Sequence, residues 1–453
     1  MPACTDMWPA ARQLSFIESN MQYKLTAPKQ INTTINLPAS KSISNRALII
    51  HALSCRNSAH ELKDSEQFTL PQNLSDCDDT QVMIKALNDM PDVIDIKAAG
   101  TAMRFLTAYL SVTPGTHIIT GTERMKNRPI KVLVDALRYL GADIEYMEKE
   151  GYPPLRITGK ELEGSRLEIP GNVSSQYISA LLLIGPVLKK GLEIELTGDI
   201  ISRPYIDLTL HTMHDMGVKV EWSDVKTIST QHQQYAPKAF SIENDWSAAS
   251  YWYEIMALSN DSSLSAHASN QFSIKLNGLT DGSRQGDSVV RYLFSMLGVK
   301  TSFENTHPGI PTTVTLKKVP TRLPRLDYNF INQPDLAQTF VVCCACMGIP
   351  FHFTGLSSLR IKETDRMEAL IREMRKIGFV IKERNESELL WEGERCEPTM
   401  EPIDTYEDHR MALAFAPLCI KYPGLRINNP QVVTKSYPNF WNDLKQAGFI
   451  IEE

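Results

Sequence analysis

The chain has no apolar run long enough to cross a lipid bilayer, which excludes a helical membrane protein. Its first twenty residues also lack the basic and then apolar order of a secretion signal. Basic residues are not in excess, since 47 Lys and Arg face 53 Asp and Glu for a formal net charge of -6. Nucleic-acid binding normally requires a basic surface, so basic clusters here indicate local sites. We therefore expect a cytoplasmic protein that binds neither membrane nor nucleic acid.

The eight cysteines lack the paired spacing of a zinc site. Cys343, Cys344 and Cys346 share one apolar run, FVVCCACMGI, and the other five are scattered as Cys4, Cys55, Cys77, Cys396 and Cys419. Cysteine readily takes the place of a small hydrophobic residue in a protein core. We interpret these residues as buried free thiols and expect no metal.

A chain of 453 residues exceeds what one hydrophobic core usually supports, so two domains are expected. A convincing strand pattern begins only at Met21, so we interpret residues 1–20 as a disordered or cloning-derived extension. The stretch from Ser223 to Pro237 is rich in Ser, Thr, Gln and His and has little periodicity. We interpret this stretch as a crossing between the domains.

One pattern recurs along the chain: a helix-like segment ends in an apolar residue and a glycine, and a strand-like run follows at once. It occurs at 135–146, 210–222, 291–303, 370–383 and 444–453, with a weaker version at 83–97. The glycines fit the position after a helix C-terminus and are spaced by about 70 to 80 residues. The period predicts six αβ units, three in each domain, with sheets facing helices.

Polar and cationic groups gather where several predicted helices begin. Lys41, Ser42 and Arg46 precede or open an apolar helix in LPASKSISNRALII (37–50). The N-terminus of a helix favours anions, and added cations make a phosphate or carboxylate the expected ligand. An ordinary capped helix with a solvated basic turn is the alternative, and this stretch alone does not decide between them.

Similar clusters follow at the later predicted helix starts. In the first half they are Gly100 with Arg104, Arg124 with Arg128, Ser174 with Ser175 and Gln176, and Ser202 with Tyr205. In the second half they are Asp335, Lys362 with Glu363 and Arg366, Asp408 with Arg410, and Lys435. Each has a plain structural alternative, such as close helix packing at Gly100 or a carboxylate favoured by the helix dipole at Asp335.

Nine of these segments resemble, in order and spacing, the signatures of the 5-enolpyruvylshikimate-3-phosphate synthase family. They are PASKSISNR, AGTAMR, RMKNRPI, VSSQ, ISRPYID, PDLAQT, IKETDR, EDHRMA and TKSYPNF. The resemblance extends from Met21 to the C-terminus. It implies an α/β fold of two similar domains, each an inside-out barrel of three βαβαββ-type units, that close on a central cleft. The implied domains are 40–242 and 21–39 with 243–453.

The resemblance also implies a reaction of the shikimate pathway, toward chorismate and the aromatic amino acids. The enolpyruvyl group of phosphoenolpyruvate passes to the 5-hydroxyl of shikimate 3-phosphate, and phosphate is released. No cofactor or metal is implied, the partners are these two small substrates, and we expect a monomer. Because both substrates carry several negative charges, cationic helix starts have a physical purpose.

Residue by residue, the resemblance implies contacts to both substrates. Those to shikimate 3-phosphate fall on Lys41, Ser42, Arg46, Ser174, Ser175, Gln176, Ser202, Tyr205, Asp335 and Lys362. Those to phosphoenolpyruvate fall on Lys41, Gly100, Arg124, Gln176, Arg366, Arg410 and Lys435. Asp335 resembles the base at the hydroxyl, while Glu363 and Lys362 resemble the pair that handles the methylene proton.

Three positions depart from the family pattern: Ala98, Phe105 and Ser358. The family is the target of glyphosate, a mimic of phosphoenolpyruvate, and Gly100 matches the family's glycine, so sensitivity is expected. One alternative is the related enolpyruvyl transferase that acts on a nucleotide sugar, but its loop cysteine has no counterpart near RMKNRPI. The other is a silent clamp that only binds phosphorylated metabolites, against which Asp335, Lys362 and Glu363 argue.

Overall fold

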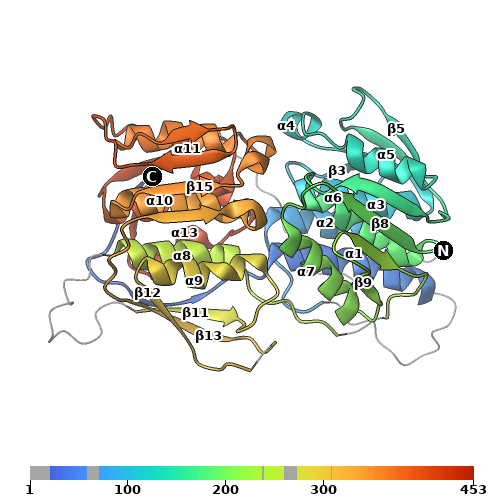
Figure 1. Ribbon diagram of the computed structural model, residues 1–453, viewed down its shortest axis with the longest axis horizontal. Helices are drawn as coiled ribbons and strands as arrows, with labels where there is room; N and C mark the ends of the chain where they lie inside the picture. The colour runs from blue at the N-terminus through green and yellow to red at the C-terminus, as the bar shows by residue number, and fades with distance from the viewer. Residues whose placement is uncertain (1–20, 59–70, 237–238, 260–272, 308) are drawn as a thin grey trace. The chain divides into compact units, whose positions relative to one another are not determined.

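The computed structural model describes residues 21–58, 71–236, 239–259, 273–307 and 309–453 (Figure 1). The interpretation of residues 1–20 and of Cys4 lies outside these ranges. The described chain divides into two compact units. Unit 1 holds Ala39–Ile242, and unit 2 holds 21–38 together with Glu243–Glu453.

Unit 1 contains two four-stranded sheets of the same topology. The first module runs β3 (Val93–Asp95), α3 (Gly100–Val112), β4 (Gly115–Thr120), α4 (Glu123–Lys126), α5 (Lys131–Tyr139), β5 (Asp143–Tyr146) and β6 (Leu155–Gly159). The second runs β7 (Arg166–Pro170), α6 (Ser175–Ile184), β8 (Leu192–Thr197), α7 (Arg203–Asp215), β9 (Val220–Trp222) and β10 (Thr227–Thr230). The sheet orders are β3-β4-β6-β5 and β7-β8-β10-β9, with the first pair parallel and the others antiparallel.

Each module is therefore a βαβαββ unit, as expected from the fold class. The remaining helices of unit 1 are α1 (Lys41–Ser58) and α2 (Asp78–Asp89). A single parallel bridge between Gln72 and Ser241 accompanies them.

Unit 2 contains one module that is continuous in sequence. It runs β14 (Leu326–Asn329), α10 (Ala337–Met347), β15 (Phe351–Thr354), α11 (Arg366–Lys376), β16 (Lys382–Arg384) and β17 (Glu388–Trp391). Its sheet order, β14-β15-β17-β16, repeats the pattern of unit 1.

The other two sheets of unit 2 each include a strand from the start of the chain. The second sheet joins β2 (Asn32–Asn36) in parallel to β11 (Ser273–Leu279), and also holds β12 (Val299–Phe303) and β13 (Thr312–Lys318), with α8 (Trp246–Leu258) and α9 (Val290–Met296). The third places β1 (Gln22–Thr26) between β18 (Leu425–Asn428) and β19 (Ile450–Glu452), with α12 (His409–Phe415) and α13 (Phe440–Gln446). Unit 2 therefore cannot be completed without residues 22–36.

The glycine pattern read from the sequence is confirmed. Gly141, Gly217, Gly298, Gly378 and Gly448 each follow a helix and have φ between 82° and 99°. This left-handed conformation costs other residues energy but not glycine, so each helix ends there and a strand begins within a few residues. In the weaker version of the pattern, Met90 directly follows α2 and is also left-handed, with φ of 38°.

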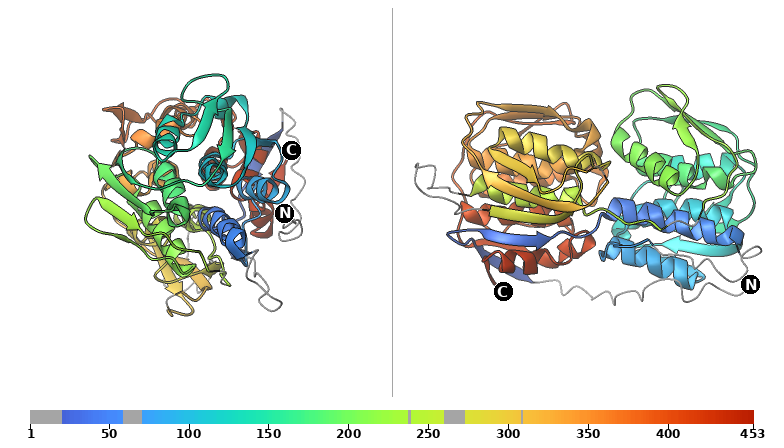
Figure 2. Two further views of the ribbon diagram at one scale, coloured as in Figure 1. Left: turned by 90° about the vertical axis from the view of Figure 1, so that its right-hand side faces the viewer. Right: turned by 90° about the horizontal axis from the view of Figure 1, so that it is seen from below.

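Helices fill the interior of each unit, and the sheets cover them (Figure 2). Residues alternate between buried and exposed along β7, and between buried and mostly half-buried along β8, because one face of each strand packs on helices. Helices α3 and α8 are buried along almost their whole lengths. Polar side chains at the starts of such interior helices need hydrogen-bond or ion-pair partners, because buried polar groups in proteins are normally paired.

Two further predictions can be compared with the structure. The described part of the predicted crossing, residues 223–236, is not a crossing, because it contains β10, which pairs with both β8 and β9, and the chain changes unit after Ile242. Among the described cysteines, Cys77, Cys343, Cys344 and Cys419 are buried free thiols, as predicted, while Cys55, Cys346 and Cys396 are half-buried.

Candidate active site

The carboxylate of Asp335 is surrounded by three cations of unit 2. Asp335 lies in the short 3-10 helix Pro334–Leu336, directly before α10. Its Oδ1 is 2.9 Å from Arg366 Nη1 and 3.3 Å from Lys362 Nζ, and its Oδ2 is 3.1 Å from Arg410 Nη2. The starts of α10, α11 and α12 therefore meet at one carboxylate.

These charges determine the ionisation of Asp335. Burial acts to raise its pKa, and Glu363 acts in the same direction. The positive charges of Arg410, Lys362 and Arg366 outweigh both and hold the pKa well below its ordinary value. Asp335 is consequently a carboxylate at neutral pH, able to accept a proton.

Glu363 occupies a similar position between two cations. Its Oε1 is 2.7 Å from Lys435 Nζ, and its Oε2 is 3.0 Å from Arg366 Nη2. Lys435 ends the 3-10 helix Pro430–Lys435, so a fourth segment reaches the same cluster. Arg366 bridges the two carboxylates, since its Nη1 donates to Asp335 and its Nη2 to Glu363.

A residue without a predicted role, Asp408, completes the cluster. Both of its oxygens bind Arg366, at 2.6 Å from Nε and 3.2 Å from Nη2. Its Oδ1 also accepts from the backbone N–H of Arg410 at 2.9 Å, so it caps α12. The sequence showed an acidic residue at a helix start, but the pairing with Arg366 depends on tertiary packing.

The six residues predicted in the second half of the chain are thus brought together. Four cations stand against three carboxylates, namely Lys362, Arg366, Arg410 and Lys435 against Asp335, Glu363 and Asp408. The formal balance of the cluster is one positive charge. A small polyanion could exchange with the carboxylates for these cations.

In unit 1, Arg46 ties together the starts of three helices. Its guanidinium donates to Thr209 Oγ1, to Ser179 Oγ and to the backbone oxygens of Ser42 and Tyr205, at 2.8 to 3.2 Å. Burial lowers its pKa to about 10, which still leaves it charged at neutral pH. Most of its donors bind protein groups, so Arg46 organises α1, α6 and α7 as well as supplying charge.

The other predicted residues of unit 1 lie at the same helix starts. Ser174 caps α6 by accepting from the backbone N–H of Gln176, whose side chain donates to Thr101 Oγ1 at 3.1 Å. Ser175 opens α6, and Ser202 precedes α7 with a left-handed φ of 54°. Lys41, the first residue of α1, is 3.2 Å from the buried Asp79 on α2, a partner that was not predicted.

The guanidinium that lies against Gly100 belongs to Arg128, for which the sequence predicted no role. Arg124 lies exposed on the short helix α4. A Cβ built on Gly100 would lie 2.6 Å from Nη1 and 3.0 Å from Nη2 of Arg128, which is largely buried. Glycine at position 100 therefore leaves space for the Arg128 guanidinium beside the first turn of α3.

A family model described as EPSP synthase (3-phosphoshikimate 1-carboxyvinyltransferase) matches residues 25–444. The chain belongs to the EPSP synthase family. A curated relative from Bacteroides fragilis, a 3-phosphoshikimate 1-carboxyvinyltransferase, is 58% identical over 95% of this chain and 99% of its own length. One of the same name from Photobacterium profundum is 34% identical over 92% of this chain and 96% of its own length.

Solved structures of low sequence identity share the EPSP synthase fold. An EPSP synthase from Acinetobacter baumannii matches with a TM-score of 0.71 at 19% identity, covering 95% of this chain and all of that one. The enolpyruvyl transferase NikO from Streptomyces tendae matches with a TM-score of 0.68 at 12% identity, covering 96% and 99%. The α/β fold of two similar domains expected from the sequence is thereby shown.

The positions that depart from the EPSP synthase pattern lie beside the predicted site residues. The ring of Phe105 lies 5.5 Å from the guanidinium carbon of Arg46, so it packs beneath this cation. Ser358 lies in the 3-10 helix Ser357–Ile361, which leads to Lys362. Ala98 lies two residues before Gly100.

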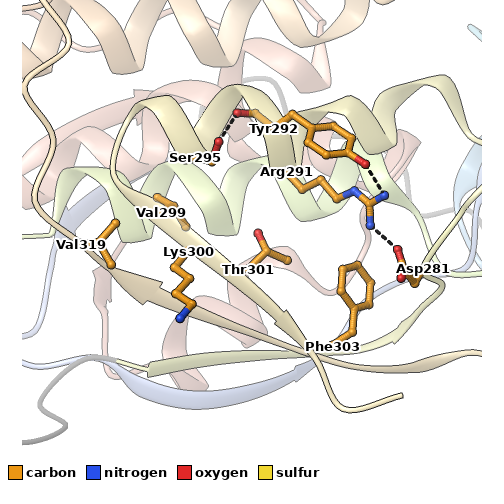
Figure 3. Close-up of a pocket in the computed structure, with 9 residues that line it drawn as sticks. All are labelled: Asp281, Arg291, Tyr292, Ser295, Val299, Lys300, Thr301, Phe303 and Val319. Atoms are coloured by element: carbon orange, nitrogen blue, oxygen red, sulfur yellow. Dashed lines mark hydrogen bonds and ion pairs between the residues drawn. The ribbon is translucent and has the colours of Figure 1, made fainter. Parts of the chain in front are cut away.

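A hollow of about 560 Å³ elsewhere in unit 2 shares no residue with the charged cluster of this EPSP synthase family member (Figure 3). It lies between α9 and β12, where Arg291 is paired with Asp281 and with the hydroxyl of Tyr292.

In the described part of the chain, no three His, Cys, Asp or Glu residues are arranged to hold a metal ion. The described helices also include none with the length and apolar character needed to cross a membrane.

Proposed function

We propose that this chain transfers the enolpyruvyl group of phosphoenolpyruvate to the 5-hydroxyl of shikimate 3-phosphate and releases phosphate, the reaction of the family to which it belongs. The observation that carries the proposal is the cluster around Asp335 and Glu363. Two carboxylates suited to proton transfer are held there among four cations suited to a polyanionic substrate.

In the proposed reaction, Asp335 takes the proton of the 5-hydroxyl as this oxygen attacks carbon 2 of phosphoenolpyruvate. Glu363, with Lys362, gives a proton to the methylene carbon, which becomes a methyl group. As the carbon–oxygen bond to phosphate breaks, Glu363 takes a proton back from the methyl group so that the double bond re-forms, and the proton held by Asp335 leaves with the phosphate. The low pKa of Asp335 means that the group starts as a carboxylate, and transfer of its cations to the substrate would make it a stronger base.

We assign the cations of unit 2 mainly to phosphoenolpyruvate. Arg366, Arg410 and Lys435 would bind its carboxylate and phosphate, while Lys362 also serves shikimate 3-phosphate. In the structure these cations bind Asp335 and Glu363. Substrate binding would therefore loosen some of these pairs and free the carboxylates for chemistry.

We assign the helix starts of unit 1 mainly to shikimate 3-phosphate. Its contacts would be Ser42, Arg46, Ser174, Ser175, Gln176, Ser202 and Tyr205, with Lys41 shared between both substrates. Hydroxyl and amide groups suit a phosphate and a ring that carries hydroxyls. The pairing of Lys41 with Asp79 supports its position, because a buried carboxylate fixes the end of a flexible side chain.

For phosphoenolpyruvate in unit 1 we propose Arg128 in place of the Arg124 expected from the sequence. Its guanidinium lies against Gly100, whereas Arg124 is exposed. Gly100 and Gln176 would complete this part of the site. The monomeric state and the cytoplasmic location remain predictions from the sequence.

A phosphate-release assay tests the proposed function. Phosphate should appear only when both substrates are present, and omission of either should abolish it. Asp335→Ala should retain shikimate 3-phosphate binding, measured by calorimetry, and lose turnover. Binding of both substrates to the wild-type protein without phosphate release would contradict the proposal and favour a silent clamp.

A further inference from the structure

The hydroxyl of Tyr251 on α8 binds one of the two terminal nitrogens of Arg410. Its Oη lies 3.2 Å from Arg410 Nη1, while the other terminal nitrogen, Nη2, lies 3.1 Å from Asp335 Oδ2. The Arg410 guanidinium is thus fixed between a hydroxyl and a carboxylate. Tyr251 is 2% exposed, and its ring packs edge-on against Phe440 with ring centroids 6.2 Å apart.

The hydrogen of this hydroxyl has no acceptor among the described residues. A guanidinium can only donate, so the Tyr251 oxygen is the acceptor in its bond with Arg410. The described residues contain no second hydrogen-bond partner for Tyr251. Burial raises its pKa to about 12, against the opposing effect of Arg410, so the hydroxyl keeps its hydrogen at neutral pH.

Four other buried tyrosines do not share this arrangement. In each the hydroxyl has an oxygen partner that can accept its hydrogen: Tyr177 with Pro129 O, Tyr235 with Leu183 O, Tyr253 with Thr301 Oγ1 and Tyr437 with Asp443 Oδ2. A buried hydroxyl normally donates, because an unused donor costs free energy. Tyr251 instead has its donor unused beside a cation of the proposed substrate site.

We propose that Tyr251 is a positioning residue for the anionic substrate: it holds Arg410 through its oxygen and donates its hydrogen to the carboxylate or phosphate that Arg410 binds. The inference rests on the proposed function and deepens it, since it adds a neutral donor to the charged cluster of unit 2. The substrate concerned is phosphoenolpyruvate, to which Arg410 is assigned above.

The test is Tyr251→Phe, which removes the hydroxyl and keeps the ring. Initial rates of phosphate release are measured while each substrate is varied. We expect the KM for phosphoenolpyruvate to rise about tenfold, as for loss of a hydrogen bond to a charged group. The KM for shikimate 3-phosphate and kcat at saturation should stay within about twofold of the wild-type values. The lost hydrogen bond concerns phosphoenolpyruvate alone and contributes equally to its ground state and its transition state.

Tyr253→Phe is the matched control. This tyrosine is buried on the same helix, and its hydroxyl lies 3.0 Å from Thr301 Oγ1 in place of Arg410. The Tyr253→Phe variant should leave both KM values unchanged. Thermal unfolding of both variants shows whether each retains the fold. The inference is overturned if the phosphoenolpyruvate KM of Tyr251→Phe stays within twofold of wild type. It is also overturned if both KM values rise together with a larger loss of thermal stability than in Tyr253→Phe.

Failure of the inference is separable from failure of the proposed function. A wild-type protein that releases no phosphate from the two substrates refutes the function itself. An active wild type with an unaffected Tyr251→Phe variant refutes only the role of Tyr251.

Discussion

Asp408 binds Arg366 at two points in the interior of unit 2, with Oδ2 2.6 Å from Nε and Oδ1 3.2 Å from Nη2. Both side chains are almost completely buried, at 0% and 2% exposure. The pair therefore joins the start of α12 to the start of α11. It fixes the guanidinium whose other donors reach Asp335 and Glu363.

Asp408→Asn should destabilise the fold. The change leaves the buried Arg366 with two of its three carboxylate partners, Asp335 and Glu363, and raises the positive charge of the cluster, at a cost of about 1 to 3 kcal/mol. Glu392→Gln is the matched control, because Arg325 and Glu392 also form a two-point pair, at 2.8 Å, but on the surface. That change should cost less than about 1 kcal/mol. Urea unfolding measures both, and equal losses would contradict the distinction.

Asp335→Asn should show a stability loss that disappears in acid. Burial raises the pKa of Asp335, but Arg410, Lys362 and Arg366 hold it well below its ordinary value. A depressed pKa stabilises the folded state above the unfolded value of about 4, and the effect is lost as the pH falls through the folded value. The free-energy difference between wild type and variant should be constant from about pH 7 to 5 and then shrink. A difference that grows toward acid would refute this assignment.

Glu254→Met should have the opposite pH dependence. Glu254 on α8 is fully buried, neither carboxyl oxygen has a hydrogen-bond partner among the described residues, and burial raises its pKa well above the ordinary value. Since the unfolded chain ionises first, this glutamate destabilises the fold progressively as the pH rises above about 4. The variant should be more stable by about 1 to 3 kcal/mol near neutral pH. Thermal unfolding from pH 5 to 8 should show the gain widening, and a gain independent of pH would contradict the explanation.

Arg128→Ala and Arg124→Ala should separate two arginines of one motif. If Arg128 binds the anion beside Gly100, its removal should raise the KM for phosphoenolpyruvate about tenfold or more. Arg124 is exposed, so its removal should leave the KM within about twofold. Steady-state rates with varied phosphoenolpyruvate measure both. The reverse order of effects would restore the assignment made from the sequence.

The elements that could be predicted from sequence follow local rules. A glycine after a helix and a strand directly behind it are encoded within about fifteen residues, so the repeat and its positive φ angles were recognisable. The helix starts that carry Asp335, Glu363 and Arg410 were equally visible, because polar residues there stand out before apolar runs. Their convergence on one cluster was implied only by the family resemblance.

The missed features depend on packing between distant segments. Arg366 pairs with Asp408, which lies 42 residues further along the chain. Lys41 pairs with Asp79, which lies 38 residues further along. Strand β10 was read as a linker because its sequence, TIST, is polar, yet Thr227 and Thr230 are buried between β8 and β9. Arg124 and Arg128 lie four residues apart in one motif, and the sequence does not show that Arg124 lies on the short helix α4 while Arg128 lies beside Gly100.

The insertion of β1 between β18 and β19 has a consequence for synthesis on the ribosome. Leu25 pairs with Leu425, so about 400 residues must be translated before this strand finds its first neighbour. At a rate of about 5 to 20 residues per second, the delay is roughly 20 to 80 seconds. The nascent strand β1 remains without its sheet during that interval. Residues 39–242 are translated within the same interval and can fold before it ends. The backbone hydrogen-bonding groups of β1 therefore stay unpaired with their sheet until the last thirty or so residues are made.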